Sequence, residues 1–238
     1  MTTLGIMQPY FFPYLGYYQL IFATDRWVVF DVVKYGKKSW MNRNRILHPN
    51  GGWQYVSVPV RASHDTLIGA VEMVDAQAAE RRILGQIEHY RGKAPFFHKV
   101  RDLVAESFAG TGSNRLRDLN IRSLAVVCDY LGIGFEWSIC SEMALDLPPI
   151  DHAGRWALEI SDALGARRYV NPPGGRPIFT TQEWTDRGIE LRFLEPQPLI
   201  YGCPPYELVE NLSILDVLMW NDADAVMEHI RNTVVLAD

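Results

Sequence analysis

The chain has 238 residues, of which 48% are hydrophobic and 21% are charged, close to the values of ordinary globular proteins. Its formal net charge of -5 argues against a general nucleic-acid binder, which carries a basic surface. Prolines and glycines interrupt the apolar N-terminus, and the first basic residue is Arg26. We therefore expect neither a signal peptide nor a membrane span, and a cytoplasmic protein. The histidines and cysteines show no metal-ligand spacing, so no metal or other cofactor is expected.

The first thirty residues predict a Rossmann-like βαβ unit. Residues 4–8 read as a short strand and residues 14–23 as a helix, and the continuous apolar run at 27–30 is typical of a strand buried on both faces. Pro9 and Pro13 hold the connection after the first strand in an extended turn. We expect this connection to be a functional loop.

The middle of the chain predicts two strands and then a helical region. Alternating valines favour a strand over 53–60, and residues 67–74 favour another. Three amphipathic helices are expected between about 76 and 131. The third of them begins after a cap at Ser113 or Asn114.

The last hundred residues predict further alternation of strands and helices. Gly132 ends the third helix, and the expected elements after it are a strand at 135–139, a helix at 156–164, a strand at 168–170, a helix at 181–187, a strand at 189–193 and two closing helices. This alternation favours an α/β fold, a partly parallel sheet with helices on its faces and additional helices. No linker separates domains, so we expect one domain over residues 1–238.

The first candidate site is the aromatic segment at residues 8–17. It follows the carboxyl end of a predicted parallel strand, where open α/β sheets bind ligands. Gln8, Tyr10, Tyr14 and Tyr17 are its candidate binding residues, because aromatic faces stack on a base or a sugar. An aromatic wall packed into the core explains the same residues equally well.

The second candidate is the cationic segment at residues 34–45, which carries five lysines and arginines in an otherwise acidic protein. Arginine grips phosphate with two parallel hydrogen bonds, so the pattern favours a phosphate-bearing small molecule. A solvated run of charges is the alternative. The candidate binding residues are Lys37, Lys38, Trp40, Arg43 and Arg45.

Catalytic candidates lie in and just before the same segment. Asp31 follows a predicted buried strand and is the candidate general base. Asn42 and Asn44 are candidate orienting or oxyanion-stabilising donors. We expect residues 8–17 and 31–45 to face one cleft, because both segments follow neighbouring predicted strands.

The third candidate is the loop Asn171-Pro172-Pro173-Gly174-Gly175, which the prolines and glycines keep from forming regular structure. Asn171, Gly174 and Gly175 are its candidate binding residues, since glycine lets the backbone approach a ligand closely. A plain turn is an equal alternative.

These segments together resemble the WbqC-like family over almost the whole chain. The resemblance rests on Ile6 to Tyr17, Asp31-x-x-x-Tyr35, Trp40-x-Asn42-Arg43-Asn44-x-Ile46, Tyr90-x-x-x-Ala94-Pro95-Phe96-Phe97, Leu164 to Gly175 and Leu212 to Leu218. Many members have Asp-Asp-Val-Gln-Tyr where this chain has Asp31-Val32-Val33-Lys34-Tyr35. The resemblance implies a transferase step in O-antigen or surface polysaccharide precursor synthesis, such as aminoacyl (glycyl) transfer to a nucleotide-linked sugar.

Two other classes of function stay open. One is a nucleotidylyltransferase-like or adenylate-forming enzyme, although nucleotidylyltransferases carry a histidine where this chain has Tyr17. The other is a non-catalytic nucleotide-sugar binding protein. All of them share a phosphate-bearing small-molecule ligand.

Overall fold

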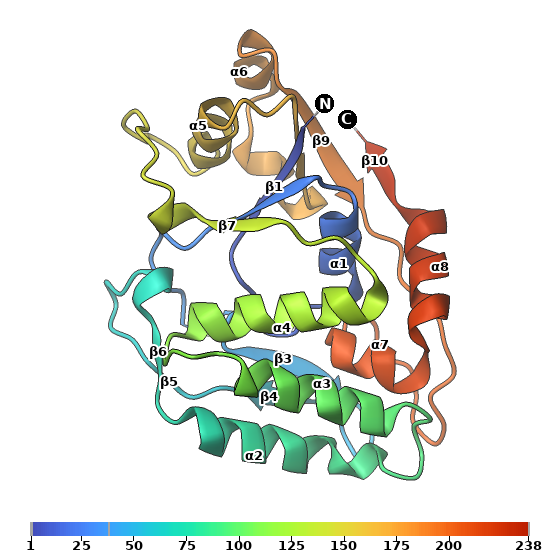
Figure 1. The fold of residues 1–238 in the computed structure, drawn as a ribbon. Helices are drawn as coiled ribbons and strands as arrows, with labels where there is room; N and C mark the ends of the chain where they lie inside the picture. The colour runs from blue at the N-terminus through green and yellow to red at the C-terminus, as the bar shows by residue number, and fades with distance from the viewer. Residues whose placement is uncertain (1, 38, 238) are drawn as a thin grey trace.

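The computed structural model describes residues 2–37 and 39–237. Among these residues, six strands form the main sheet in the order β7 (Trp137–Ile139), β2 (Arg26–Val29), β1 (Thr3–Met7), β8 (Arg168–Asn171), β9 (Glu190–Glu195) and β10 (Val235–Ala237). All neighbouring strands are parallel except β10, which runs antiparallel to β9 (Figure 1). The predicted α/β fold with a partly parallel sheet is confirmed.

The N-terminal βαβ unit is confirmed as well. Strand β1 leads through helix α1 (Leu15–Phe22) to β2, which pairs in parallel with β1. A Cβ at Gly5 would lie 2.7 Å from the Trp27 ring, so glycine at this position lets the ring lie against the neighbouring strand. Both strands are buried on their two faces, as the apolar run in β2 predicts.

Each face of the sheet packs into its own apolar cluster. Leu4, Ile6 and Val28 point to the face covered by α5 (Arg155–Ala163) and α6 (Thr181–Asp186). Trp27 and Val29 point to the opposite face, because side chains alternate along a strand. The cluster on that opposite face includes residues of α1, α7 (Ile214–Trp220) and α8 (Ala223–Thr233).

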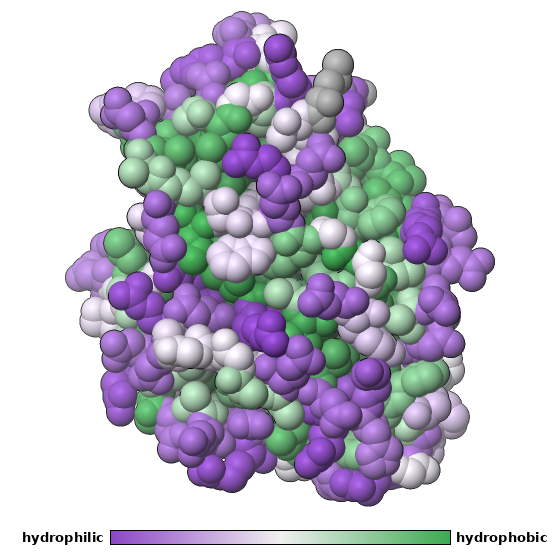
Figure 2. Space-filling model, viewed as in Figure 1, coloured by the Kyte–Doolittle hydropathy of each residue, from purple (hydrophilic) through white to green (hydrophobic). Residues whose placement is uncertain are grey.

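The second cluster continues from the sheet into a helical region. Helices α2 (Ala76–Ile87), α3 (Phe97–Ala109) and α4 (Leu116–Leu131) lie in succession beside the hairpin of β3 (Arg43–Leu47) and β4 (Trp53–Ser57) (Figure 1). On the face seen in Figure 2, hydrophilic residues cover much of this helical half, and hydrophobic residues show through between it and the sheet. This shared apolar cluster supports the prediction of one domain, which stays a prediction.

The structure differs from the sequence-based expectations in five places. Strand β3 lies inside the segment that the sequence predicts only as a cationic site, and β10 is not predicted. Helix α4 has no side-chain cap: its flanking residue is Arg115. Residues 67–74 form a short helix η1 (Ile68–Ala70) and only a two-residue strand, β6 (Glu72–Met73), which pairs with β5 (Val60–Arg61). The Pro-Gly segment after β8 is regular, a 3₁₀ helix, η4 (Pro173–Ile178), because Pro172 and Pro173 pre-set its first turn.

Candidate functional site

A cleft of about 470 Å³ opens at the carboxyl ends of β1 and β8. The strand order reverses between these neighbours, because the chain goes from β1 to β2 on one side and later reaches β8 on the other. Open α/β sheets bind ligands at such a reversal. The described residues that line the cleft are Met7, Tyr10, Pro13, Tyr14, Tyr17, Trp40, Asn44, Arg45, Pro172, Pro173, Gly174, Pro196 and Asn211.

The backbone of the aromatic segment 8–17 is held by side chains from distant elements. Asn44 on β3 donates through Nδ2 to the carbonyl oxygens of Phe11 at 3.1 Å and Phe12 at 2.8 Å. Ser213 Oγ donates to the same Phe12 oxygen at 2.7 Å. Phe12 has a φ of 37°, a left-handed conformation that costs a side-chain-bearing residue about 1–3 kcal/mol. The hydrogen bonds therefore stabilise a strained turn in the wall of the cleft.

A second buried amide joins the aromatic segment to the cationic one. Asn120 on α4 donates through Nδ2 to the carbonyl oxygens of Pro9 and Met41, both at 2.8 Å. The backbone N–H of Phe11 donates to the carbonyl oxygen of Trp40 at 2.9 Å. Residues from both segments consequently line one cleft.

Arg45 supplies the positive charge of the cleft. Its guanidinium lies 5.4 Å from the Trp40 ring and 5.2 Å from the Trp53 ring, and its Nη2 donates to the carbonyl oxygen of Asn211 at 3.2 Å. In the described part of the chain, no carboxylate lies within ion-pair distance of Arg45, and no acidic residue lines the cleft. The cleft is thus cationic and aromatic, which suits a phosphate-bearing ligand.

The tyrosines of the cleft are neutral hydrogen-bond donors. Burial raises the pKa of Tyr10 and Tyr14 above the usual 10.0, and the proximity of Tyr10 adds to the shift at Tyr14. Tyr17 is buried, and its hydroxyl donates to the carbonyl oxygen of Gln8 at 2.7 Å. Tyr17 therefore supports the loop, whereas the half-buried Tyr10 and Tyr14 present their rings to the cleft.

The cationic segment does not act as one unit in space. Lys37, Asn42 and Arg43 line a separate cavity of about 270 Å³, beside Tyr35 and β5. Asn42 donates to the carbonyl oxygen of Val58 at 3.1 Å, and the Arg43 guanidinium lies 4.3 Å from the Tyr55 ring. Lys38 lies outside the described residues.

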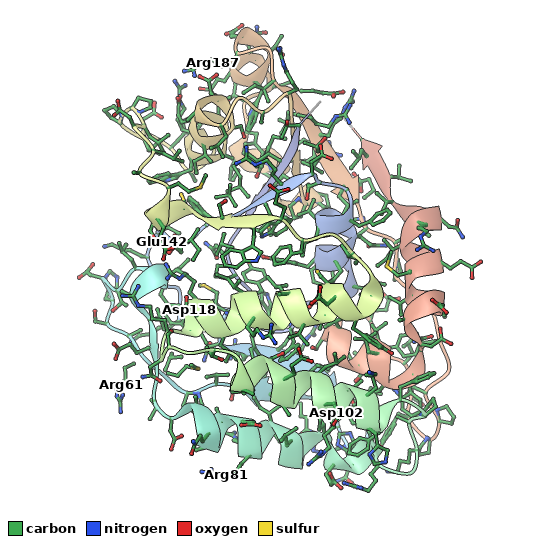
Figure 3. All side chains as sticks on the ribbon, in the orientation of Figure 1. Arg61, Arg81, Asp102, Asp118, Glu142 and Arg187 are labelled. Carbon is green, nitrogen blue, oxygen red and sulfur yellow. The ribbon has the colours of Figure 1, made fainter. Side chains whose placement is uncertain are left out.

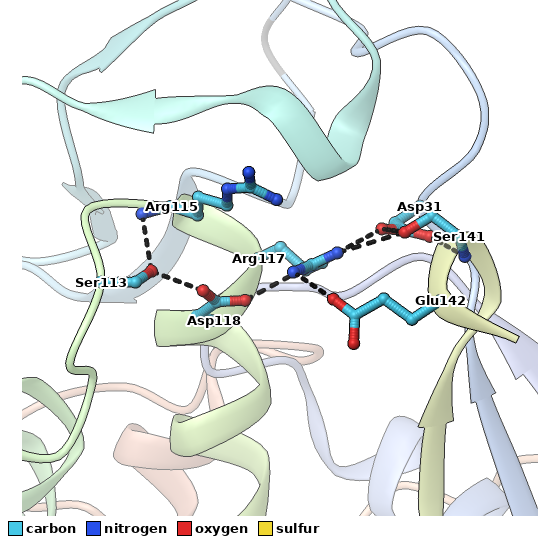
Figure 4. A network of polar contacts seen from close by, with 7 residues as sticks. All are labelled: Asp31, Ser113, Arg115, Arg117, Asp118, Ser141 and Glu142. Atoms are coloured by element: carbon cyan, nitrogen blue, oxygen red, sulfur yellow. Dashed lines mark hydrogen bonds and ion pairs between the residues drawn. The ribbon is translucent and has the colours of Figure 1, made fainter.

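Asp31 is held away from the cleft by a network of polar contacts (Figure 4). Its Oδ2 accepts hydrogen bonds from Arg117 Nη1 at 2.8 Å and Ser141 Oγ at 2.7 Å, and its Oδ1 accepts from the Ser141 backbone N–H at 3.0 Å. Arg117 also contacts Asp118 and Glu142, each at 2.9 Å. Figure 4 shows Arg117 between these two carboxylates, of which Asp118 lies on α4 and Glu142 lies in the short helix after β7.

These contacts favour a structural role for Asp31. Its side chain is completely buried and that of Arg117 is 5% exposed, so the pair ties α4 to the carboxyl end of β2 out of reach of solvent. The catalytic roles of Asp31, Asn42 and Asn44 stay predictions from the residue pattern. For Asn44, both amide N–H groups already bind backbone carbonyls, and none is left for a ligand.

The predicted site after β8 divides between two neighbouring cavities. Gly174 lines the main cleft, whereas Asn171 and Gln8 line an adjoining one. Asn171 accepts a hydrogen bond from Tyr169 at 2.6 Å. A Cβ at Gly175 would lie 1.9 Å from Asn171 Nδ2, so Gly175 makes room for this amide and is absent from the wall of the cleft.

Replacing Gly175 with alanine tests this close approach. We expect the Asn171 amide to be displaced and the protein to lose about 1–3 kcal/mol of stability, the usual cost of overpacking. Gly174→Ala is the control, because nothing lies within 4 Å of a Cβ there. Urea unfolding measures both, and equal stabilities of the two variants would contradict the prediction.

Pro196 and Asn211 are lining residues that no sequence pattern predicted. Both line the cleft and also a further cavity of about 220 Å³, which includes Tyr201 and Glu210 and lies beside the start of α1. The carboxyl end of β9 was the signal for Pro196, because it lies at the same edge of the sheet as that of β8. Asn211 comes from a distant loop and has a φ of 56°, which no local pattern indicates.

A buried carboxylate supports the wall of this further cavity. Asp216 on α7 accepts hydrogen bonds from the Leu47 N–H at 2.8 Å, from the Tyr90 hydroxyl and, at 3.4 Å, from the hydroxyl of Tyr201. Burial raises the pKa of Asp216 above its usual 3.8, and these donors offset part of the shift. The folded protein thus binds this proton more tightly than the unfolded chain does.

The protonation of Asp216 should consequently stabilise the folded protein most at low pH. Its contribution to the free energy of unfolding is fully present below pH 3.8 and is lost as the pH rises through the raised pKa of the folded state. Asp216→Asn stays neutral, so the stability advantage of the parent protein over the variant should shrink from pH 4 towards neutrality. Urea unfolding of both proteins across this range tests it; a constant or growing difference would contradict it.

Metal clusters, disulfides and membrane-spanning helices are absent from residues 2–37 and 39–237. No group of three or more histidine, cysteine or acidic side chains is arranged to hold a metal ion there. The three cysteines, Cys128, Cys140 and Cys203, are unpaired and buried. No described helix has the length and apolar character that crossing a membrane requires.

Fold and cleft together define an α/β protein with a cationic, aromatic cleft at the strand-order reversal of a mostly parallel sheet. The model of the WbqC-like protein family matches residues 8–228, and the chain belongs to this family. The uncharacterized protein Rv1507c of Mycobacterium tuberculosis is 30% identical over 202 residues, covering 82% of this chain and 83% of that protein. No solved structure matched the chain significantly.

Proposed function

We propose that the protein binds a nucleotide-linked sugar in the 470 Å³ cleft and is a transferase in the synthesis of O-antigen or surface polysaccharide precursors. The observation that carries the proposal is Arg45, a cation without an ion-pair partner in the described residues, set among aromatic rings at the carboxyl edge of the sheet. A phosphate beside Arg45 would form an ion pair with its guanidinium. Tyr10 and Tyr14 offer faces for a ring and neutral hydroxyls for oxygen acceptors.

The cavity beside the cleft supports a transfer reaction, because such a reaction needs room for a second substrate. It shares Tyr14, Pro196 and Asn211 with the cleft. Glu210 is the only acidic residue among the described residues that line the two cavities. In aminoacyl transfer, an amine of the sugar attacks the acyl carbonyl, the leaving group departs with its electron pair, and the amine loses a proton. Glu210 is our candidate acceptor of this proton.

Binding is tested with two arginine variants from the same strand. We expect Arg45→Ala to weaken binding of UDP, chosen as a phosphate-bearing probe, by about 1.5–3 kcal/mol, or roughly 10- to 100-fold, the scale of hydrogen bonds to charged groups. Arg43→Ala is the matched control, because it removes the same charge from a separate cavity. Calorimetry measures the affinities and melting curves establish folding. If Arg43 holds the phosphate instead, Arg43→Ala should weaken UDP binding and Arg45→Ala should not. If neither variant changes the affinity, the proposed anion site is wrong.

Turnover is tested by mass spectrometry of reactions with nucleotide-sugars, a glycine donor and ATP. We expect Glu210→Gln to lower product formation on the order of 100- to 10,000-fold, the usual contribution of a general base, with nucleotide affinity unchanged. Asp31→Asn, run beside it, should lower stability and activity together. Product formation by Glu210→Gln at the parental rate would rule out the proposed base, and binding without any product would favour a nucleotide-sugar binding protein.

A further inference from the structure

A side cavity of about 200 Å³ extends the main cleft along the edge of the sheet. It shares Met7 and Tyr10 with the cleft and reaches the carboxyl end of β2 at Phe30. Its other walls come from α5, through Trp156, and from the residue after η4, Phe179. The cavity and the cleft therefore form neighbouring compartments at the ends of adjacent parallel strands.

The chemistry of the two compartments differs. None of the described residues that line the side cavity is charged, whereas Arg45 lines the cleft. The Phe30 and Trp156 rings meet edge to face with centroids 5.6 Å apart, and both side chains are only partly buried. An uncharged, aromatic cavity beside a cationic one suits a ligand with a flat neutral ring next to a phosphate group.

The side cavity also contains an amide that can read the edge of such a ring. Gln8 follows β1, is half-buried, and its side chain makes no hydrogen bond within the described residues. Its carbonyl oxygen and NH₂ group together match an acceptor and a donor on the edge of a nucleobase. The backbone beside this side chain is fixed, because the Gln8 carbonyl oxygen accepts the Tyr17 hydroxyl.

We infer that the side cavity is a nucleobase subsite, in which Trp156 and Phe30 form the walls for the ring and Gln8 binds its polar edge. The inference rests on the proposed function, since it places the base of the same ligand whose phosphate lies at Arg45. It also sets the direction of the ligand: base towards β2, phosphates at the ends of β1 and β8, and the sugar towards Glu210.

The test is calorimetry of the 238-residue chain with UDP, CDP, ADP and GDP as base-bearing probes and pyrophosphate as the base-free probe. We expect the best nucleoside diphosphate to bind at least about 5-fold more tightly than pyrophosphate, and Trp156→Leu to remove this preference, since stacking on an aromatic ring contributes roughly 5- to 100-fold per base. Gln8→Leu should reduce the discrimination among the four bases and leave pyrophosphate binding unchanged. Because the Gln8 side chain has no partner in the described residues, this variant should keep the parental melting temperature even if Trp156→Leu does not fold.

Arg45→Ala, measured in parallel, separates this inference from the proposed function. It should weaken all five probes alike. If Arg45→Ala does so while Gln8→Leu leaves the base discrimination unchanged, the base subsite is wrong and the anion site stands. Equal binding of pyrophosphate and every nucleoside diphosphate to the parent protein also overturns the subsite, and an absence of binding by all five probes overturns both proposals.

Discussion

Replacing Arg117 with alanine is expected to lower the stability of the protein by about 3–5 kcal/mol, the cost of leaving a buried charge without its partner. Arg117 contacts Asp31 at 2.8 Å, and the two side chains are almost inaccessible to solvent. Burial by itself lowers the pKa of Arg117, but its hydrogen bonds to Asp31 and Asp118 outweigh that effect and raise it. The guanidinium therefore stays charged and is bound firmly in place.

Urea unfolding of the variant measures this loss, and Arg81→Ala is the matched control. Arg81 lies on α2 and points outward into solvent (Figure 3), so its removal should change stability by less than about 0.5 kcal/mol. The double variant Asp31→Asn/Arg117→Met should recover part of the loss, because neither of the new side chains is charged. A loss below 1 kcal/mol in Arg117→Ala would mean that water reaches the carboxylate.

Asn44→Ala should cost about 2–4 kcal/mol of stability and weaken ligand binding at the same time. The substitution removes the donor to two backbone carbonyls, of Phe11 and Phe12, and each buried carbonyl without a partner costs about 1–3 kcal/mol. Phe12 keeps only the hydrogen bond from Ser213, which limits the total. The strained turn at Phe12 should then relax and move the aromatic wall of the cleft.

The matched control is Asn42→Ala, two residues away, which loses one hydrogen bond to Val58 and touches no wall of the main cleft. We expect a loss of about 1 kcal/mol there and unchanged affinity for UDP. Unfolding and calorimetry on both variants separate the two roles considered for Asn44. If Asn44 is a catalytic donor, Asn44→Ala should lose turnover and keep its stability and affinity. If Asn44 supports the loop as described above, the variant should lose stability and affinity together.

Much of the framework follows from local sequence patterns. The apolar run of β2, the alternation in β9 and the amphipathic repeats of α2, α3 and α4 are properties of short windows, and so they predict their elements correctly. Gly132 has a φ of 71° and ends α4, as its position after the last apolar residue of the helix indicates. The position of a cleft after β1 follows from the same reasoning, because parallel strands end at one edge of the sheet.

The composition of the cleft was decided by tertiary structure. Residues in and just before the cationic segment diverge: Asp31 forms a buried ion pair, Arg43 lines one cavity and Arg45 lines another. Neighbouring side chains in a turn or strand point in different directions. Hydrophobic periodicity does not predict which distant residue each of these side chains contacts.

The long-range hydrogen bonds show the same limit most clearly. The bond from Asn44 to Phe12 spans 32 residues, and the one from Ser213 to Phe12 spans 201. The sequence by itself determined that an aromatic loop would follow the first strand at the edge of the sheet where the cleft opens. Only the packing of β3, α4 and α7 against that loop decided which side chains hold it, because buried carbonyls need donors and the folded chain alone brings those donors within reach.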